Sequence, residues 1–176
     1  MNFSGRARPT HPVRHARPPA LRRGTEQASL VRALDGYVGD LSALRHSADL
    51  PDALRDPAVE ALVAARDARD VAGRVARAVD GLDTALDRAH DIGQGLTPSP
   101  AAAATLARMY DRRDRLLAAL RDGLAQVQDV HTNLLELSAA LELHRAGSAG
   151  AEVGAVGHRL EVLRRAFTEL EVAAAR

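Results

Sequence analysis

The side chains that could do chemistry are few in this chain of 176 residues. It contains no cysteine, which excludes thiolate catalysis, a disulfide framework and cysteine-based zinc or iron–sulfur sites. Histidine and carboxylate side chains are then the main candidates, because an imidazole titrates near neutral pH and both groups bind metal ions. Two places in the chain are candidates for such chemistry: His131, and the pair formed by Asp87 and His90.

His131 begins the segment His-Thr-Asn-Leu-Leu, which loosely resembles the phosphoacceptor helix of sensor kinases. The segment lacks the acidic residue that directly follows that histidine and also the later proline. A phosphoacceptor must reach solvent, whereas the spacing of the neighbouring apolar residues places His131 on the packed face of a helix. We therefore expect a structural role for His131.

Asp87 and His90 are three residues apart, a spacing at which one helix can offer two ligands to a metal ion. A two-metal site in a helical bundle needs such a pair on two helices, and the sequence contains it once. Glu142 and His144 are two residues apart and would point to different faces of a helix. The sequence also lacks a phosphate-binding glycine loop and the Gly-x-Ser-x-Gly motif of hydrolases. We expect no catalytic, metal or cofactor site and infer no small-molecule substrate.

The elements that would position these residues are predicted to be helices. Hydrophobic residues make up 46% of the chain and aromatic residues 2%, so the core must consist of Ala, Leu and Val. Ala and Leu favour helices, and the residues that favour strands are scarce apart from Val. Apolar positions recur at alternating spacings of three and four, which is typical of a helix that faces a partner.

The predicted helices cover about residues 26–45, 57–92, 100–145 and 151–174. Asp56 with Pro57, and Ser99 with Pro100, provide an N-cap residue followed by proline at the first helical position. Short connections between the helices favour antiparallel neighbours. We predict an all-α fold, an elongated antiparallel helical hairpin or four-helix bundle with coiled-coil-like packing, in one domain over residues 25–176.

The third predicted helix has the most regular apolar stripe of the chain. The helix outruns the first and fourth predicted helices, so part of the stripe is expected to lack a partner inside the chain and to serve a partner protein or self-association. Arg113, His131 and Ser138 are its polar positions, and we expect the guanidinium of Arg113 to reach a carboxylate at the rim. The candidate contact residues of this stripe are Leu106, Tyr110, Arg113, Leu117, Leu120, Leu124, Val127, His131 and Leu134.

Residues 1–24 are predicted to form a disordered basic tail. Residues 1–23 contain six arginines, four of the eight prolines and no acidic residue. Three hypotheses stay open for the tail: an uncommitted extension, a tether to anionic lipid, or a nucleic-acid contact. The candidate contacts are Arg6, Arg8, Arg14, Arg17, Arg22 and Arg23.

The leading functional hypothesis is a non-enzymatic helical interaction or scaffold protein of the cytoplasm. All 24 basic residues are arginine, which indicates a GC-rich, bacterial genome, and no stretch of about 20 apolar residues could span a membrane. One alternative is a peripheral envelope-stress or membrane-remodelling factor at the inner face of the membrane. A long helical hairpin behind a basic leader is similar in layout to membrane-associated proteins of the phage-shock type. A further alternative is a nucleoid-associated DNA-binding protein.

The structural role of His131 can be tested by substitution. We expect His131→Leu to leave the free energy of unfolding unchanged or to raise it, because a polar group on a packed stripe costs stability. Urea unfolding followed by circular dichroism measures this change. A loss above about 1 kcal/mol would indicate a hydrogen bond that His131 makes in the folded chain.

Overall fold

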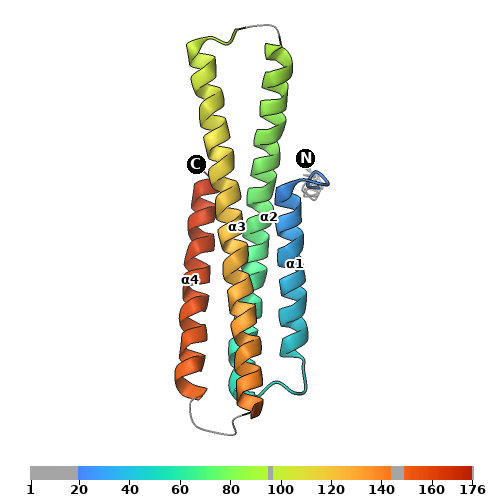
Figure 1. Cartoon of the computed structure of the whole chain (residues 1–176), viewed down its shortest axis with the longest axis vertical. Helices are drawn as coiled ribbons and strands as arrows, with labels where there is room; N and C mark the ends of the chain where they lie inside the picture. Colours follow the sequence, from blue (N-terminus) through green and yellow to red (C-terminus); the bar gives the residue numbers. More distant parts are fainter. Residues whose placement is uncertain (1–19, 95–96, 144–148, 176) are drawn as a thin grey trace, which may run out of the picture.

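The computed structural model describes residues 20–94, 97–143 and 149–175. The helices in these ranges are α1 (Glu26–Arg45), α2 (Asp52–Gly93), α3 (Pro100–Leu143) and α4 (Ala149–Ala175). They lie side by side along one long axis, each antiparallel to the next in sequence (Figure 1). The prediction of an all-α helical bundle is confirmed.

The first helix begins and ends where the sequence predicts. The Thr25 hydroxyl oxygen accepts a hydrogen bond from the Ala28 N–H at 3.4 Å, and Glu26 adds a negative charge to the first turn. Both features stabilise the positive end of a helix dipole. Gly24 enters this cap with φ of 80°, a conformation that favours glycine over any residue with a Cβ.

The second helix begins at Asp52, so the prediction of a start at residue 57 with an Asp56 cap is wrong. Pro57 lies inside the helix, where it removes one backbone hydrogen bond. Leu50, Leu54 and Ala58 are buried together, in contact with Leu44 of α1 and Leu137 of α3. Extending the helix buries Leu54 and Ala58 on one face, and we infer that this burial offsets the bond lost at Pro57.

The other helix ends differ little from the predicted ones. α3 begins at Pro100, where the Ser99 hydroxyl oxygen accepts from the Ala102 N–H at 3.3 Å, as its cap motif predicts. α3 ends at Leu143 and α4 runs from Ala149 to Ala175, so each differs from its prediction by two residues or fewer at an end. The predicted link at residues 146–150 falls largely outside the described residues.

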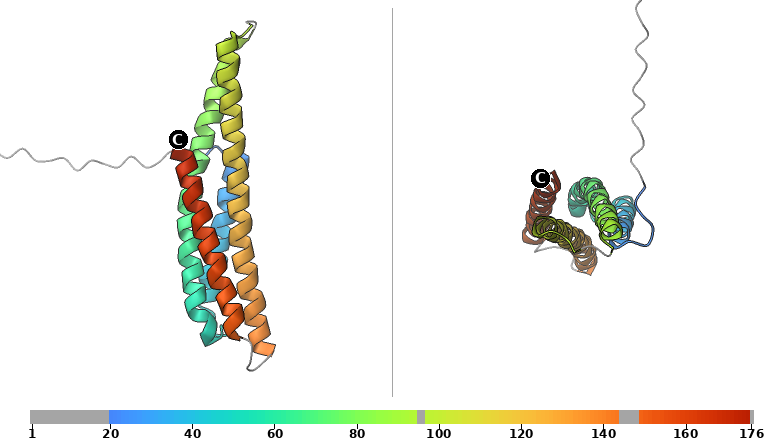
Figure 2. Two further views of the ribbon diagram at one scale, coloured as in Figure 1. Left: turned by 90° about the vertical axis from the view of Figure 1, so that its left-hand side faces the viewer. Right: turned by 90° about the horizontal axis from the view of Figure 1, so that it is seen from above.

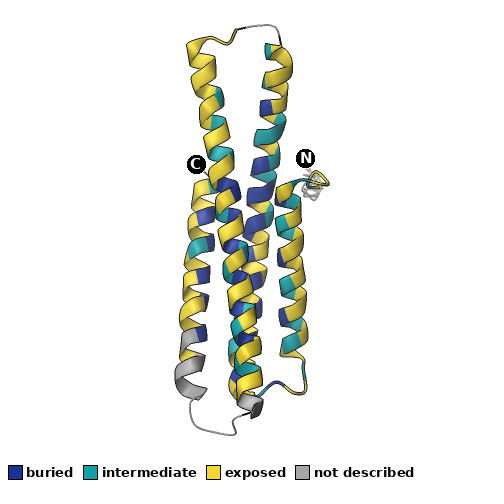
Figure 3. Cartoon of the chain, viewed as in Figure 1, coloured by how far each residue is buried: buried dark blue, intermediate teal, exposed yellow. Residues whose placement is uncertain are grey.

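The two long helices form the centre of the bundle. α2 and α3 each pack against the three other helices, whereas α1 and α4 make no contact among the described residues. They lie on separate sides of the α2–α3 pair, as the end-on view in Figure 2 shows. The buried positions form a continuous interior along the four helices (Figure 3). α2 contributes mostly alanines to it, namely Ala61, Ala64, Ala65, Ala68, Ala72 and Ala76.

The contact of α3 with α4 depends on a glycine, which has no side chain. The Phe167 ring of α4 is buried over Gly123 of α3, and a Cβ built on Gly123 would lie 2.6 Å from the ring carbon Cζ. Real Cβ atoms do not approach another atom that closely. Gly123 therefore makes room for the largest side chain in this part of the core.

The α2–α3 hairpin extends beyond α1 and α4 at one end of the molecule (Figure 1). We call this extension the hairpin end and define it as residues 84–93 of α2 and residues 100–111 of α3. The prediction that α3 outruns its shorter neighbours is thus correct.

Two glycine substitutions should change stability in opposite directions. Gly123→Ala should lower the free energy of unfolding by up to about 2 kcal/mol, because crowding against Phe167 outweighs the better helix propensity of alanine. Gly39→Ala in α1 should raise it by about 0.5–1 kcal/mol, since nothing lies within 4 Å of the new Cβ. Urea unfolding of both variants measures the difference. Equal stabilisation by the two alanines would show that Phe167 does not pack on Gly123.

Candidate interaction site at the hairpin end

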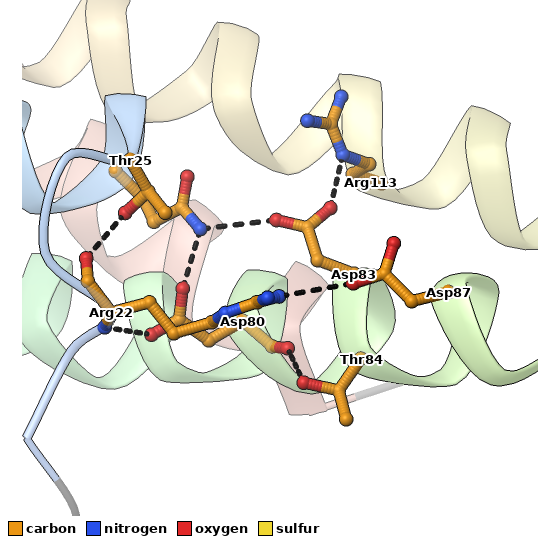
Figure 4. Close-up of polar contacts among 8 residues, drawn as sticks. Arg22, Thr25, Asp80, Asp83, Thr84, Asp87 and Arg113 are labelled. Carbon is orange, nitrogen blue, oxygen red and sulfur yellow. Dashed lines mark hydrogen bonds and ion pairs between the residues drawn. The ribbon is translucent and has the colours of Figure 1, made fainter.

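A buried polar layer lies at the base of the hairpin end. Gln27 of α1 is 1% exposed. Its side-chain Nε2 donates to Asp80 Oδ1 at 2.5 Å and to Asp83 Oδ2 at 3.1 Å, both on α2 (Figure 4). Because a buried amide without partners is costly, these two bonds fix the level at which α1 starts along α2.

Arg113 extends the polar layer to α3. Its Nε donates to Asp83 Oδ1 at 2.5 Å and its Nη1 donates to Asp114 Oδ1 at 3.0 Å. The hydrogen bond to Asp83 raises the pKa of Arg113 above its ordinary value, with partial burial acting in the opposite direction. The expectation that the guanidinium reaches a rim carboxylate is confirmed.

Residues 20–24, assigned above to the tail, lie against α2. The Arg22 N–H donates to Asp80 Oδ2 at 3.0 Å, and Arg22 Nη1 donates to Asp87 Oδ2 at 3.2 Å. Leu21 is partly buried against the core. The predicted tail boundary at residue 24 is therefore wrong, because the carboxylates of Asp80 and Asp87 hold this stretch in place.

Of the other candidate contacts in the tail, Arg23 lies within the described residues. Arg23 is exposed, whereas Arg22 is paired with Asp87. Arg6, Arg8, Arg14 and Arg17 lie outside the described residues. The lipid and nucleic-acid contacts proposed for this segment stay hypotheses.

The polar layer is also where α4 ends. Arg112 Nη2 donates to the Ala174 carbonyl oxygen at 3.0 Å, next in sequence to the Arg113 that reaches α2. α1 therefore begins and α4 ends at nearly one level of the α2–α3 hairpin. Beyond this level α2 and α3 continue without the outer helices (Figure 1).

The hairpin end contains an open apolar cleft of about 1060 Å³ between the ends of α2 and α3. Ile92, one of its lining residues, is 77% exposed. The ribbons of α2 and α3 diverge toward their connection in Figure 1. The apolar lining side chains are Ala89 and Ile92 from α2, Pro98 from the connection, and Ala101, Ala102, Leu106 and Met109 from α3.

The stripe on α3 divides into two parts. Most of the stripe residues in the four-helix part belong to the core. Leu117, Leu120, Val127 and Leu134 are fully buried there, and Leu124 is partly buried. These side chains are in contact with other helices of the same chain and are not presented at its surface. Leu106 and Tyr110 lie in the hairpin end, half-buried and 52% exposed respectively.

His131 and Ser138 are half-buried in the four-helix part. The His131 ring lies beside the ring of Tyr37 from α1, with 5.5 Å between the centroids and a tilt of 56°. This aromatic contact has the spacing of an ordinary packing pair.

Some residues of the site were missed in the sequence, although a signal was present. Asp80, Asp83, Asp87 and Asp91 recur at spacings of three and four, which places four carboxylates along one face of α2. That pattern could have indicated an acidic stripe beside the apolar one. Gln27 gave no such signal, because its burial depends on the packing of α1 against α2.

The described helices and connections contain no group of three or more His, Cys, Asp or Glu residues that could hold a metal ion. The carboxylate of Asp87, which the sequence paired with His90, accepts a hydrogen bond from Arg22. In the described part of the chain, none of the helices is both long and apolar enough to cross a membrane.

The chain was compared with protein-family models, with curated proteins and with solved structures, and none of the three comparisons found a match.

The polar layer makes a testable contribution to stability. Arg113→Leu should lower the free energy of unfolding by about 1–3 kcal/mol, because it leaves the partly buried Asp83 carboxylate without its cation. Arg115→Leu is the matched control, since Arg115 pairs with Asp111 at the surface and should cost less than about 0.5 kcal/mol.

A second substitution separates charge from packing in that experiment. Adding Asp83→Asn to Arg113→Leu should recover part of the loss, because the amide oxygen can still accept from Gln27 and carries no charge. Urea unfolding monitored at 222 nm gives all three values. Equal losses for Arg113→Leu and Arg115→Leu would contradict a stabilising role for the layer.

Proposed function

We propose that this chain is a non-enzymatic helical interaction protein that binds a protein partner through the hairpin end. The observation that carries the proposal is the apolar cleft between α2 and α3, with Ile92 77% exposed beside it. In the four-helix part, the same two helices bury their apolar stripes against α1 and α4. At the hairpin end those stripes continue while the covering helices stop.

The size and chemistry of the cleft favour a helical partner over a small polar ligand. Its lining is largely aliphatic, and the aliphatic side chains follow the helical spacing of α2 and α3. A helix laid along two others buries such side chains by interdigitation, as α1 and α4 do farther along the hairpin. Full burial of an exposed isoleucine contributes about 2 kcal/mol to such a contact.

The charged residues on the body of the bundle support this location. Arg74 with Glu171, Arg121 with Glu26 and Arg69 with Asp35 form ion pairs between helices. These partly exposed pairs contribute little free energy each, and they compensate the charges of the six residues concerned. The hairpin end combines an exposed apolar residue with a cleft, which is the composition of a contact surface.

Site-specific photo-crosslinking tests the proposed function. A photoreactive phenylalanine analogue at position 92 should give, in living cells, a covalent adduct with one protein that mass spectrometry identifies. The same analogue at Val63, which is 47% exposed on the body of α2, is the matched control and should give little adduct. Adding Leu106→Glu to the position 92 variant should remove the adduct, because a carboxylate in the cleft opposes apolar contact.

Two results would contradict the proposal. One is the absence of any protein adduct at position 92 when the labelled chain is folded and expressed. The other is an equal adduct at positions 92 and 63, which would indicate random encounters.

A further inference from the structure

We propose that the partner at the hairpin end is a second copy of this chain, bound antiparallel about a twofold axis. This inference rests on the proposed function and names its partner. In the proposed dimer, the two hairpin ends lie side by side and together form a second four-helix bundle. Each hairpin supplies the pair of helices that α1 and α4 supply in the body.

The length of the hairpin end sets how far two copies can overlap. α1 and α4 stop at the level of the Asp83–Arg113 pair, so an incoming hairpin is blocked there. In the hairpin end α2 has 10 residues and α3 has 12, a length of about 15–18 Å at 1.5 Å per residue. The furthest overlap brings the start of α3 in one copy to the level of Arg113 in the other.

This furthest overlap defines which residues meet. Because Asp83 and Arg113 are paired, Ile92, nine residues beyond Asp83, lies level with Ala104, nine residues before Arg113. When Pro100 lies level with the partner's Arg113, Leu106 falls beside the partner's Leu106 at the twofold axis. Ile92 then lies level with the partner's Met109, so the apolar lining residues of the two clefts meet one another.

The same register brings opposite charges together. Asp91, one residue before Ile92, falls level with the partner's Arg108, and the twofold axis repeats the pair. Both side chains are exposed, and within the described residues neither takes part in an ion pair of its own chain. Within the hairpin end, Asp87 is paired with Arg22 of its own chain and Asp111 with Arg115, so Asp91 and Arg108 are the opposite charges that this register brings together. Antiparallel pairing places Asp91 of each copy against Arg108 of the other, which favours this register over a parallel one.

The size of the overlap predicts a weak dimer. A stable interface buries about 800 Å² on each partner, and an overlap of about three helical turns buries less. We therefore expect a dissociation constant on the order of micromolar, and a dimer that dissociates on dilution.

The first experiment is light scattering with sedimentation velocity on the full chain over a hundredfold range of concentration. The mass should rise from 18.7 kDa toward twice that value as concentration increases. Ile92→Glu should weaken dimerisation at least about tenfold, because it places a charge at the apolar centre of the interface. Val63→Glu, a change on the body of the same helix, is the matched control and should leave the dimer unchanged.

A charge exchange tests the register itself. Asp91→Arg alone and Arg108→Asp alone should each weaken self-association about tenfold, because each places two pairs of like charges across the axis. An equimolar mixture of the two variants should restore the dimer, since both cross-axis pairs are then of opposite sign. Restoration by mixing requires contact between chains, because contact within one chain cannot depend on mixing.

The outcomes separate this inference from the proposed function. A monomer at all concentrations overturns the second-copy inference, while a heterologous adduct at position 92 would leave the proposed function standing. A dimer unaffected by Ile92→Glu and by both charge changes shows that the chains meet elsewhere, and it also overturns the inference. Failure of both the dimer and the crosslink would reject both proposals.

Discussion

Burial of one face of α2 against the three other helices is the interaction on which the bundle depends. That face consists largely of alanine, whose small side chain lets neighbouring helices approach closely, while leucine and valine from the neighbours fill the space. Close packing of this kind gains many small dispersion contacts and removes apolar area from water. It also makes α2 the helix against which the others are positioned, since α1, α3 and α4 all pack on it.

The polar layer then fixes where the packed region ends. An apolar stripe of small residues allows one helix to slide along another at little cost, because successive turns are similar. Gln27 and Arg113 remove that freedom, since each finds its carboxylate partner on α2 at one level. Partly buried polar contacts often set register at some cost in stability. Here they set the level at which α1 begins and hence the length of hairpin that stays uncovered.

The uncovered length links the fold to the proposed function. A hairpin that ended with its outer helices would present polar connections at that end, as a self-contained bundle does. This hairpin instead presents an aliphatic cleft, with Asp91 exposed on α2 and Arg108 exposed on α3. In the proposed dimer a twofold axis brings Asp91 of one copy to Arg108 of the other and the two clefts to one another.

The sequence by itself determined the helices and much of their length. Local signals were sufficient for α1, with its Thr25 cap, and for the start of α3 at Pro100, because capping and hydrophobic period act between residues close in the chain. The predicted start of α2 was wrong because the Asp56–Pro57 signal is local, whereas Leu54 is buried by residues of α1 and α3.

Only the tertiary structure decided which parts of the α3 stripe are core and which are exposed. Leu120 and Leu106 have the same place in the repeat, yet Leu120 is covered by its neighbours and Leu106 lies where they have stopped. The hydrophobic period indicates only that a side chain faces a partner helix. Whether a partner helix is present there depends on the lengths of the other helices and on where along the bundle they begin and end. Those levels come from contacts between residues far apart in the chain, such as Gln27 with Asp80, which no local pattern encodes.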